Sequence, residues 1–186
     1  LHVRSRRQRQ MCIRDSINTS QVAVFGHSRH GKAALWAGAT DQRFAMIISN
    51  CSGCGEAALS RRAIGETIQA VNQQFPIGFV ATSGNTTENT LPFDQHELIA
   101  LLAPRPVYIA SATEDQWADP KGEFYPDYSG NEFIFGAKGL DTKEMPPSDT
   151  PLQDGSIAYH IRSGRHDITQ YDWKQYVKFA DKWFRK

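Results

Sequence analysis

Four short runs of consecutive apolar residues recur along the chain. They read QVAVF, FAMIIS, VYIASA and IAYHIR, and they span Gln21–Phe25, Phe44–Ser49, Val107–Ala112 and Ile157–Arg162. Each run is short and apolar throughout instead of alternating, which is typical of strands that are covered on both faces. We therefore predict four buried strands of a mostly parallel sheet.

Helical patterns lie between and after these runs. We predict helices over Lys32–Ala39 and Glu56–Val71, a third that Asp94 caps and Pro104 stops, and a fourth over Asp172–Lys186. The apolar residues of the fourth recur every three or four positions, which predicts that one face packs on the core: Trp173, Tyr176, Val177, Ala180, Trp183 and Phe184.

Strands that alternate with helices predict an α/β fold. Loops are expected over Thr82–Thr90, which is rich in Gly, Asn and Thr, and over residues 141–155, which contain three prolines. With 40% hydrophobic and 22% charged residues, the 186-residue chain has an ordinary globular composition. We expect one folded unit over residues 17–186.

Residues 1–16 do not fit this pattern. They have no strand or helix period, and five of them are arginines: Arg4, Arg6, Arg7, Arg9 and Arg14. Such runs can be nucleic-acid arms or transit peptides, but this one resembles translated adapter sequence. We interpret it as an artefact or a disordered tail.

Charge and cysteine content exclude several functions. A net charge of +1 favours neither a nucleic acid nor a membrane as partner, and no apolar run approaches the roughly 20 residues of a membrane-spanning helix. Cys51 and Cys54 have the spacing of a zinc knuckle, but a structural zinc site needs four ligands and no second pair exists. We expect no metal and no cofactor. We interpret Cys51 and Cys54 as two small apolar residues near a strand end.

The segment GHSRHG, from Gly26 to Gly31, joins the first strand to the first helix. A serine in a tight glycine turn between strand and helix is typical of a nucleophile elbow. The usual pattern is G-x-S-x-G, and here the second glycine comes one position late. The run by itself therefore also fits an incidental Ser28 in a glycine turn.

The rest of the chain favours the catalytic interpretation. In α/β-hydrolases the nucleophile is followed by an acid and then a histidine, each after a strand. Asp115 follows the third strand and His166 follows the fourth. His166 would take the Ser28 proton, and Asp115 would orient the imidazole.

Other candidates for base and acid carry weaker support. Two histidines flank Ser28 but should point away from it, one begins a helix, and one lies within a strand as a core residue: His27, His30, His96 and His160. Glu114 and Asp119 also lie near the third strand end, and we interpret them as solvated loop charges.

The sequence then resembles the glucuronoyl esterases, over Ile17 to Lys186. The resemblance rests on GHSRHGKAALWAGA, ISNCSGCGEAALSRR, LPFDQHELIALLAPRPVYIASATEDQWADPKGEF, the Gly65-Glu66 step and the His166 loop. It implies an α/β-hydrolase fold, a three-layer sandwich of which this chain would be the second half.

The resemblance also implies roles for individual residues. Arg29 would stabilise the oxyanion, Lys32 and Glu66 would bind sugar hydroxyls, and Trp117 would offer its indole to the sugar ring. Without the resemblance, Lys32 and Glu66 would be interpreted as ordinary surface charges.

Two departures from the family pattern change the picture. Many members carry a glutamate after the strand that follows the elbow, and Cys51 aligns with it, which leaves Asp115 as the acid. Fungal members carry a disulfide-bonded cysteine before the serine, where this chain has His27. The chain therefore resembles the bacterial type.

The expected function is that of a serine carboxylic-ester hydrolase on esters of (4-O-methyl)-glucuronic acid. Its partner would be glucuronoxylan or a lignin–carbohydrate ester, and the enzyme would be a monomer, secreted or periplasmic. The alternatives are an acetyl xylan esterase, a peptidase or a non-catalytic carbohydrate-binding relic. We expect the chain to be a C-terminal fragment that folds poorly alone, because its strand Gln21–Phe25 would lack a neighbour.

Overall fold

The core of the protein is a sheet of four parallel strands. The structure, a computed structural model, describes residues 17–75, 87–129, 139–140 and 142–185. The strands pair in chain order: β1 (Ala23–His27), β2 (Met46–Asn50), β3 (Val107–Ala112) and β4 (Ile157–Arg162). The tail predicted over residues 1–16 and part of the predicted loop, residues 82–86, lie outside the described residues.

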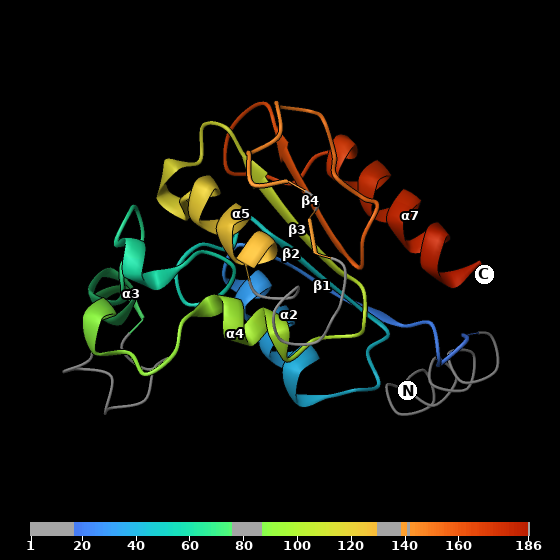
Figure 1. Cartoon of the computed structure of the whole chain (residues 1–186), viewed down its shortest axis with the longest axis horizontal. Coiled ribbons are helices and arrows are strands. Elements are labelled where there is room, and N and C mark those ends of the chain that lie inside the picture. Colours follow the sequence, from blue (N-terminus) through green and yellow to red (C-terminus); the bar gives the residue numbers. More distant parts are fainter. Residues whose placement is uncertain (1–16, 76–86, 130–138, 141, 186) are drawn as a thin grey trace, which may run out of the picture.

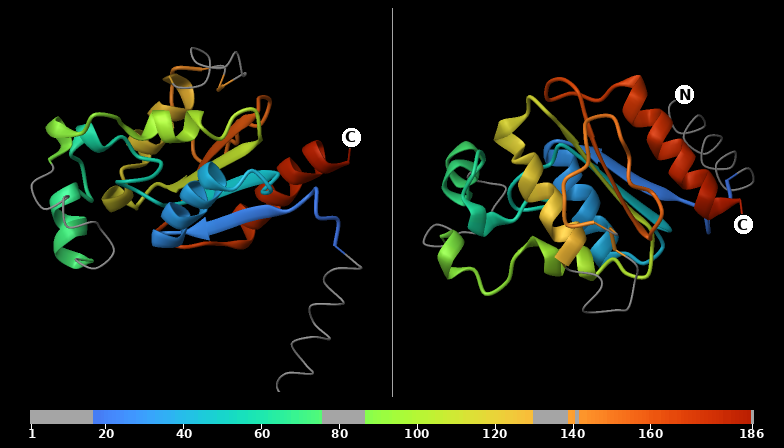
Figure 2. Two further views of the ribbon diagram at one scale, coloured as in Figure 1. Left: turned by 90° about the horizontal axis from the view of Figure 1, so that it is seen from below. Right: turned by 45° about the horizontal axis from the view of Figure 1, so that its top comes forward.

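Helices cover both faces of this sheet. On one face lie α2 (Arg29–Thr40), α4 (Gln95–Ala100) and α5 (Pro120–Ser129), while α7 (Gln170–Phe184) lies along the other (Figures 1 and 2). A short helix, α3 (Ile68–Gln74), lies apart from the sheet (Figure 1). The predicted α/β fold with a parallel sheet is confirmed.

The two layers of helices explain why the strands are apolar throughout. Alternate residues of a strand point to opposite faces. Ile47 and Ile109 pack in the cluster that contains Leu35 of α2, whereas their neighbours Ile48 and Tyr108 pack in the cluster that contains α7. Both faces therefore need apolar side chains.

The strand boundaries differ from the prediction at one side of the sheet. β3 and β4 have the predicted bounds, but β1 and β2 begin two residues later and run on to His27 and Asn50. The backbones of these two polar residues pair with each other across the ladder. Pairing between strands, which apolar runs do not reveal, sets these ends.

The helix predicted over Glu56–Val71 is wrong. That stretch contains a single turn of 3-10 helix, Ser60–Arg62, and only the beginning of α3. Gly65 has φ 66°, and a Cβ there would lie 2.3 Å from the backbone oxygen of Trp117. The next residue, Glu66, donates its N–H to that same oxygen at 2.7 Å. Docking against the Trp117 loop therefore overrides the helical composition of this segment.

Among the described residues, no helix combines the length and the apolar character that crossing a membrane requires.

Candidate active site

Ser28 occupies a tight turn between β1 and α2. It is the N-cap of α2 with φ 56° and ψ −134°, an unusual backbone conformation for a residue other than glycine. A Cβ on Gly26 would lie 1.8 Å from the His30 oxygen, and one on Gly31 would lie 2.8 Å from the Ser49 hydroxyl. Both glycines are therefore required by close packing, and the late second glycine serves the contact between α2 and β2.

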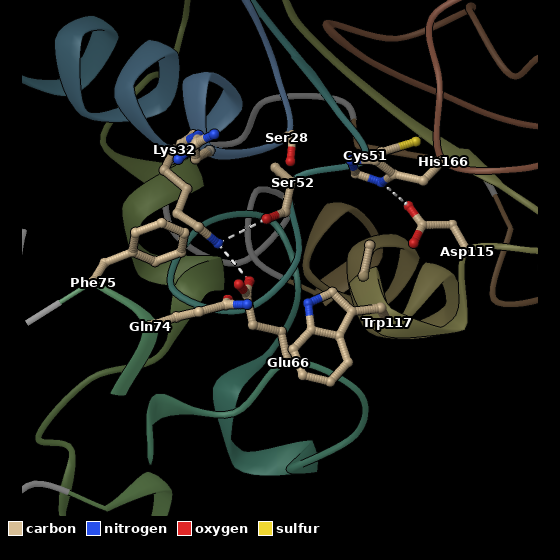
Figure 3. Close-up of a pocket in the computed structure, with 12 residues that line it drawn as sticks. Ser28, Lys32, Cys51, Ser52, Glu66, Gln74, Phe75, Asp115, Trp117 and His166 are labelled. Carbon is tan, nitrogen blue, oxygen red and sulfur yellow. Dashed lines mark hydrogen bonds and ion pairs between the residues drawn. The ribbon is translucent and has the colours of Figure 1, made fainter. Parts of the chain in front are cut away.

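The turns that follow all four strands meet at one edge of the sheet, because the strands are parallel. Ser28 follows β1, Cys51 follows β2, Asp115 follows β3 and His166 follows β4. They line one cavity of about 300 Å³ (Figure 3). All seven residues named from the sequence line this cavity: Ser28, Arg29, Lys32, Glu66, Asp115, Trp117 and His166.

Asp115 and His166 form a direct pair. His166 Nδ1 lies 2.6 Å from Asp115 Oδ2, with the carboxylate side chain 3% exposed and the imidazole 41% exposed. The hydrogen bond to Asp115 raises the pKa of His166, and partial desolvation opposes that rise only in part. With Nδ1 as donor to Asp115, Nε2 is left as the acceptor that a serine hydroxyl needs.

No hydrogen bond joins Ser28 to His166 within the described ranges. Both side chains line the same cavity, and Figure 3 shows them on one side of it. Such bonds are often long in unliganded enzymes and tighten when substrate binds.

The alternative acids and bases have other partners. Glu114 lies 3.4 Å from Arg165 at the surface, as expected of a solvated charge. Asp119 is buried and lies 2.6 Å from Arg62, so its interpretation as a solvated charge is wrong. His160 is fully buried between Tyr108 and Asp172, both at 2.9 Å, which confirms its interpretation as a core histidine.

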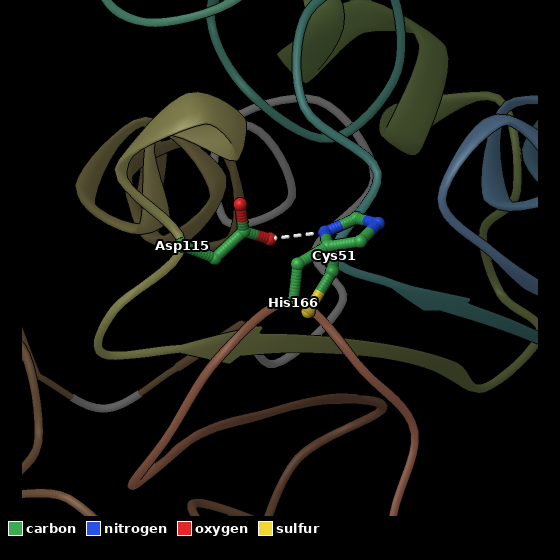
Figure 4. Close-up of side chains that lie close together, drawn as sticks. All are labelled: Cys51, Asp115 and His166. Carbon is green, nitrogen blue, oxygen red and sulfur yellow. Dashed lines mark hydrogen bonds and ion pairs between the residues drawn. The ribbon is translucent and has the colours of Figure 1, made fainter.

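Cys51 lies close to Asp115 and His166. Its Sγ, a ligand oxygen of Asp115 and a ring nitrogen of His166 all lie within 4.8 Å of one another (Figure 4). A tetrahedral zinc ion would hold its oxygen and nitrogen ligands about 3.4 Å apart, so the 2.6 Å between Asp115 and His166 fits a hydrogen bond and not joint ligation. Burial raises the pKa of the Cys51 thiol far above its usual range, which keeps it neutral.

The two cysteines of the CSGC segment have different neighbours. Cys54 Sγ contacts the Ser60 hydroxyl at 3.7 Å, and both thiols are free and buried. Of the carboxylates after the third strand, Asp115 is the one whose oxygen contacts the His166 imidazole, at 2.6 Å.

Lys32 is held at the cavity wall by four oxygens. Its Nζ lies 2.7 Å from carboxylate oxygens of both Glu56 and Glu66, and it donates to the backbone oxygens of Ser52 at 2.9 Å and Cys54 at 2.6 Å. An ammonium has three donors, so the group is fully engaged without a ligand. Burial raises the pKa of Glu56 well above its usual value, although Lys32 opposes this.

A second buried carboxylate, Glu123 of α5, supports the cavity from behind. It accepts hydrogen bonds from the backbone N–H groups of Ser52 and Gly53, at 2.7 and 3.0 Å, and from the Ser111 hydroxyl at 2.6 Å. Burial raises the pKa of Glu123 to about 7, and these hydrogen bonds reduce the rise. Glu123 fixes the loop that begins at Cys51.

The Glu123→Gln variant tests this burial cost. A carboxyl whose folded-state pKa is raised destabilises the fold as pH rises from its unfolded value of 4.5 through about 7. Glutamine keeps the shape and does not ionise. Between pH 5 and pH 8 the variant should therefore gain up to about 3 kcal/mol of unfolding free energy relative to the parent. Urea unfolding of both proteins at pH 5 and pH 8 measures this gain. If the difference in unfolding free energy between variant and parent is the same at both pH values, the pKa of Glu123 is not raised.

Besides the seven predicted residues and Cys51, the cavity wall contains four residues that sequence reasoning missed: Ser52, Gln74, Phe75 and Ala118. Gln74 ends α3 and Phe75 follows it, beyond the helix that was predicted to end at Val71. The Arg29 guanidinium lies 5.3 Å from the centre of the Phe75 ring, a cation–π contact that holds it at the mouth of the cavity. The buried glutamates Glu56 and Glu123 were also missed, because no local pattern distinguishes them from surface charges.

Comparisons with known proteins identify the family of this chain. A family model described as fungal glucuronyl esterase matches residues 9–138. A carbohydrate esterase, MZ0003, from an unknown prokaryotic organism is 53% identical over 169 residues, which is 89% of this chain and 39% of that protein. A 4-O-methyl-glucuronoyl methylesterase of Wolfiporia cocos is 36% identical over 134 residues, covering 67% of this chain and 33% of that protein.

Solved structures agree in fold. The glucuronoyl esterase from Solibacter usitatus superposes with a TM-score of 0.84 at 47% identity, over 95% of this chain and 46% of that one. A promiscuous CE15 esterase from a marine bacterial metagenome gives a TM-score of 0.83 at 52% identity, over 89% of this chain and 42% of that one. The chain therefore spans less than half the length of these relatives.

Proposed function

This chain belongs to the glucuronoyl esterase family, and we propose that it carries the catalytic site of a serine esterase that cleaves esters of glucuronic acid. The proposal rests on one observation above all. Ser28, Asp115 and His166 come from three strands and line one cavity, in which Asp115 holds His166 at 2.6 Å.

Acyl transfer would proceed in two steps. His166 Nε2 removes the Ser28 proton while Oγ attacks the ester carbonyl, and the same nitrogen then protonates the departing alcohol. This leaves a glucuronoyl ester on Ser28. Water, activated by His166, releases the acid. Asp115 stabilises the imidazolium that forms in each step.

The oxyanion would form at the beginning of α2. The backbone N–H of Arg29 is the first of that helix, where the helix dipole favours negative charge. The Arg29 guanidinium, above Phe75 at 5.3 Å, adds a positive charge at the same end of the cavity.

The cavity suits a polar ring better than a lipid chain. Its volume of about 300 Å³ lies at the small end of ligand sites, which span roughly 300–1,000 Å³. The Glu66 carboxylate lines the cavity and can accept hydrogen bonds from sugar hydroxyls. Lys32 Nζ lies 2.7 Å from this carboxylate and holds it in place. Trp117, half exposed at 52%, offers its indole N–H and ring face.

The partner in this proposal is the ester between glucuronoxylan and lignin alcohols. A polymer of that size does not enter cells, so the proposal includes export of the enzyme.

A comparison of two substrates tests whether the acid part of the cleaved ester is glucuronic acid. Benzyl glucuronate should be hydrolysed with at least tenfold higher kcat/KM than benzyl acetate, because only the former meets Glu66. Glu66→Gln should raise KM for the glucuronate about tenfold, the effect of losing one charged hydrogen bond. The same change should leave the acetate rate within about twofold.

Equal rates on both esters would favour an acetyl esterase and overturn the substrate assignment. Activity on neither ester, in protein that is folded by circular dichroism, would overturn the esterase assignment itself.

A further inference from the structure

His27 is the residue immediately before the nucleophile, yet its ring lies against the catalytic base. The centroids of the His27 and His166 rings are 4.7 Å apart, with the planes inclined at 41°. His27 is not among the residues that line the cavity. The elbow thus directs Ser28 into the cavity and His27 onto the ring of His166.

The position of His27 is fixed from behind by the sheet. It pairs with Asn50 in the register between β1 and β2, and its Nδ1 lies 2.5 Å from Asn50 Oδ1. Asn50 in turn donates its amide to the Tyr176 hydroxyl of α7 at 2.7 Å. Since an amide oxygen only accepts, Nδ1 carries the proton, and this fixes the orientation of the His27 ring.

By contrast, His166 has less support of its own. It lies in the loop after β4 with 41% of its side chain exposed, and its one hydrogen bond in the described part of the chain is to Asp115. A single hydrogen bond does not by itself fix the plane of the imidazole ring. The groups around the ring are Asp115, Cys51, Glu123, Arg162 and His27. Of these, His27 is the one with an aromatic face against the imidazole.

We propose that His27 is a positioning residue, whose ring contact holds the His166 imidazole in the orientation that brings Nε2 to Ser28. The inference rests on the proposed esterase function for its kinetic consequence. Its structural content, an ordered His166 ring, stands independently.

Three substitutions separate the ring contact from the hydrogen bond. His27→Phe keeps an aromatic ring and loses the bond to Asn50. His27→Gln keeps a group that can bond Asn50 and loses the ring, and His27→Ala loses both. His30→Ala is the control, because His30 is an exposed histidine of the same turn outside the cavity.

We expect kcat on benzyl glucuronate to fall about tenfold in the Ala and Gln variants with KM unchanged, and to stay within about threefold of the parent in the Phe variant. The control should match the parent. The proposal would be overturned if His27→Gln were as active as the parent while His27→Phe had a kcat as low as that of His27→Ala. An Ala variant with full activity, or one whose KM alone rises, would also overturn it.

A second measurement does not depend on turnover. The proton on His166 Nδ1, a nitrogen that lies 2.6 Å from Asp115 Oδ2, should give a downfield proton NMR signal. This signal should persist in the Phe variant and broaden in the Ala and Gln variants. If the parent proves inactive, the esterase function fails while this signal still decides the positioning role. A sharp, unshifted signal in all variants would overturn that role.

Discussion

Replacing Ser28 with alanine is expected to lower kcat for glucuronate ester hydrolysis by roughly ten-thousand- to million-fold. Without its hydroxyl the site has no nucleophile, and His166 and Asp115 have no proton transfer to assist. The protein should remain folded, because alanine adds no atoms at the turn. Initial rates on benzyl glucuronate and circular dichroism measure the two effects.

The control for this variant is Ser20→Ala, an exposed serine before β1 that bonds only to Asn18 in the described structure. Its activity should equal that of the parent. A serine-directed phosphonate should label the parent and the control but not Ser28→Ala. Labelling of the Ser28→Ala variant would show that another residue is the nucleophile.

Replacing Asp115 with asparagine is expected to lower kcat by roughly a thousand- to ten-thousand-fold. Asparagine can present its amide N–H to Nδ1, which favours the wrong tautomer of His166. The hydrogen bond to Asp115 is also the main cause of the raised pKa of His166. The base is active when neutral, so activity falls as pH drops through that pKa. In the variant this acid limb should move to lower pH.

Glu114→Gln is the matched control, since Glu114 is the adjacent carboxylate and faces Arg165 instead of His166. It should change kcat by less than about twofold, because its exposed ion pair contributes little. A pH–rate profile of both variants distinguishes them. If Glu114→Gln is impaired and Asp115→Asn is not, the assignment of the acid is wrong.

Much of the sheet could be predicted because the physical cause is local. β3 and β4 are buried at every position, since both faces are covered, and their mostly apolar runs have the predicted bounds. β1 and β2 end on His27 and Asn50, whose polarity does not indicate strand. Their pairing is a property of two segments together. For the same reason the helix expected from Glu56 failed, since Gly65 docks on a loop distant in sequence.

The candidate site could be predicted from the sequence for a similar reason. In a parallel sheet, residues that follow different strands meet at one edge, so the order of Ser28, Asp115 and His166 predicts proximity without any knowledge of loops. Contacts formed across the fold could not be predicted. The burial of Glu123 behind Cys51 and the packing of His27 on His166 depend on three-dimensional neighbours that no spacing reveals.

The parallel register also lets the cavity wall change in evolution while the proposed reacting groups keep their positions. The three proposed reacting groups follow β1, β3 and β4, whereas the connection over residues 51–106 joins β2 to β3 and carries none of them. Insertions or deletions in the connection over residues 51–106, which supplies Glu66 and Phe75, can remodel the cavity wall while the three reacting groups stay in place. New ester preferences could therefore be selected, or engineered by exchanging that segment, without rebuilding the catalytic apparatus.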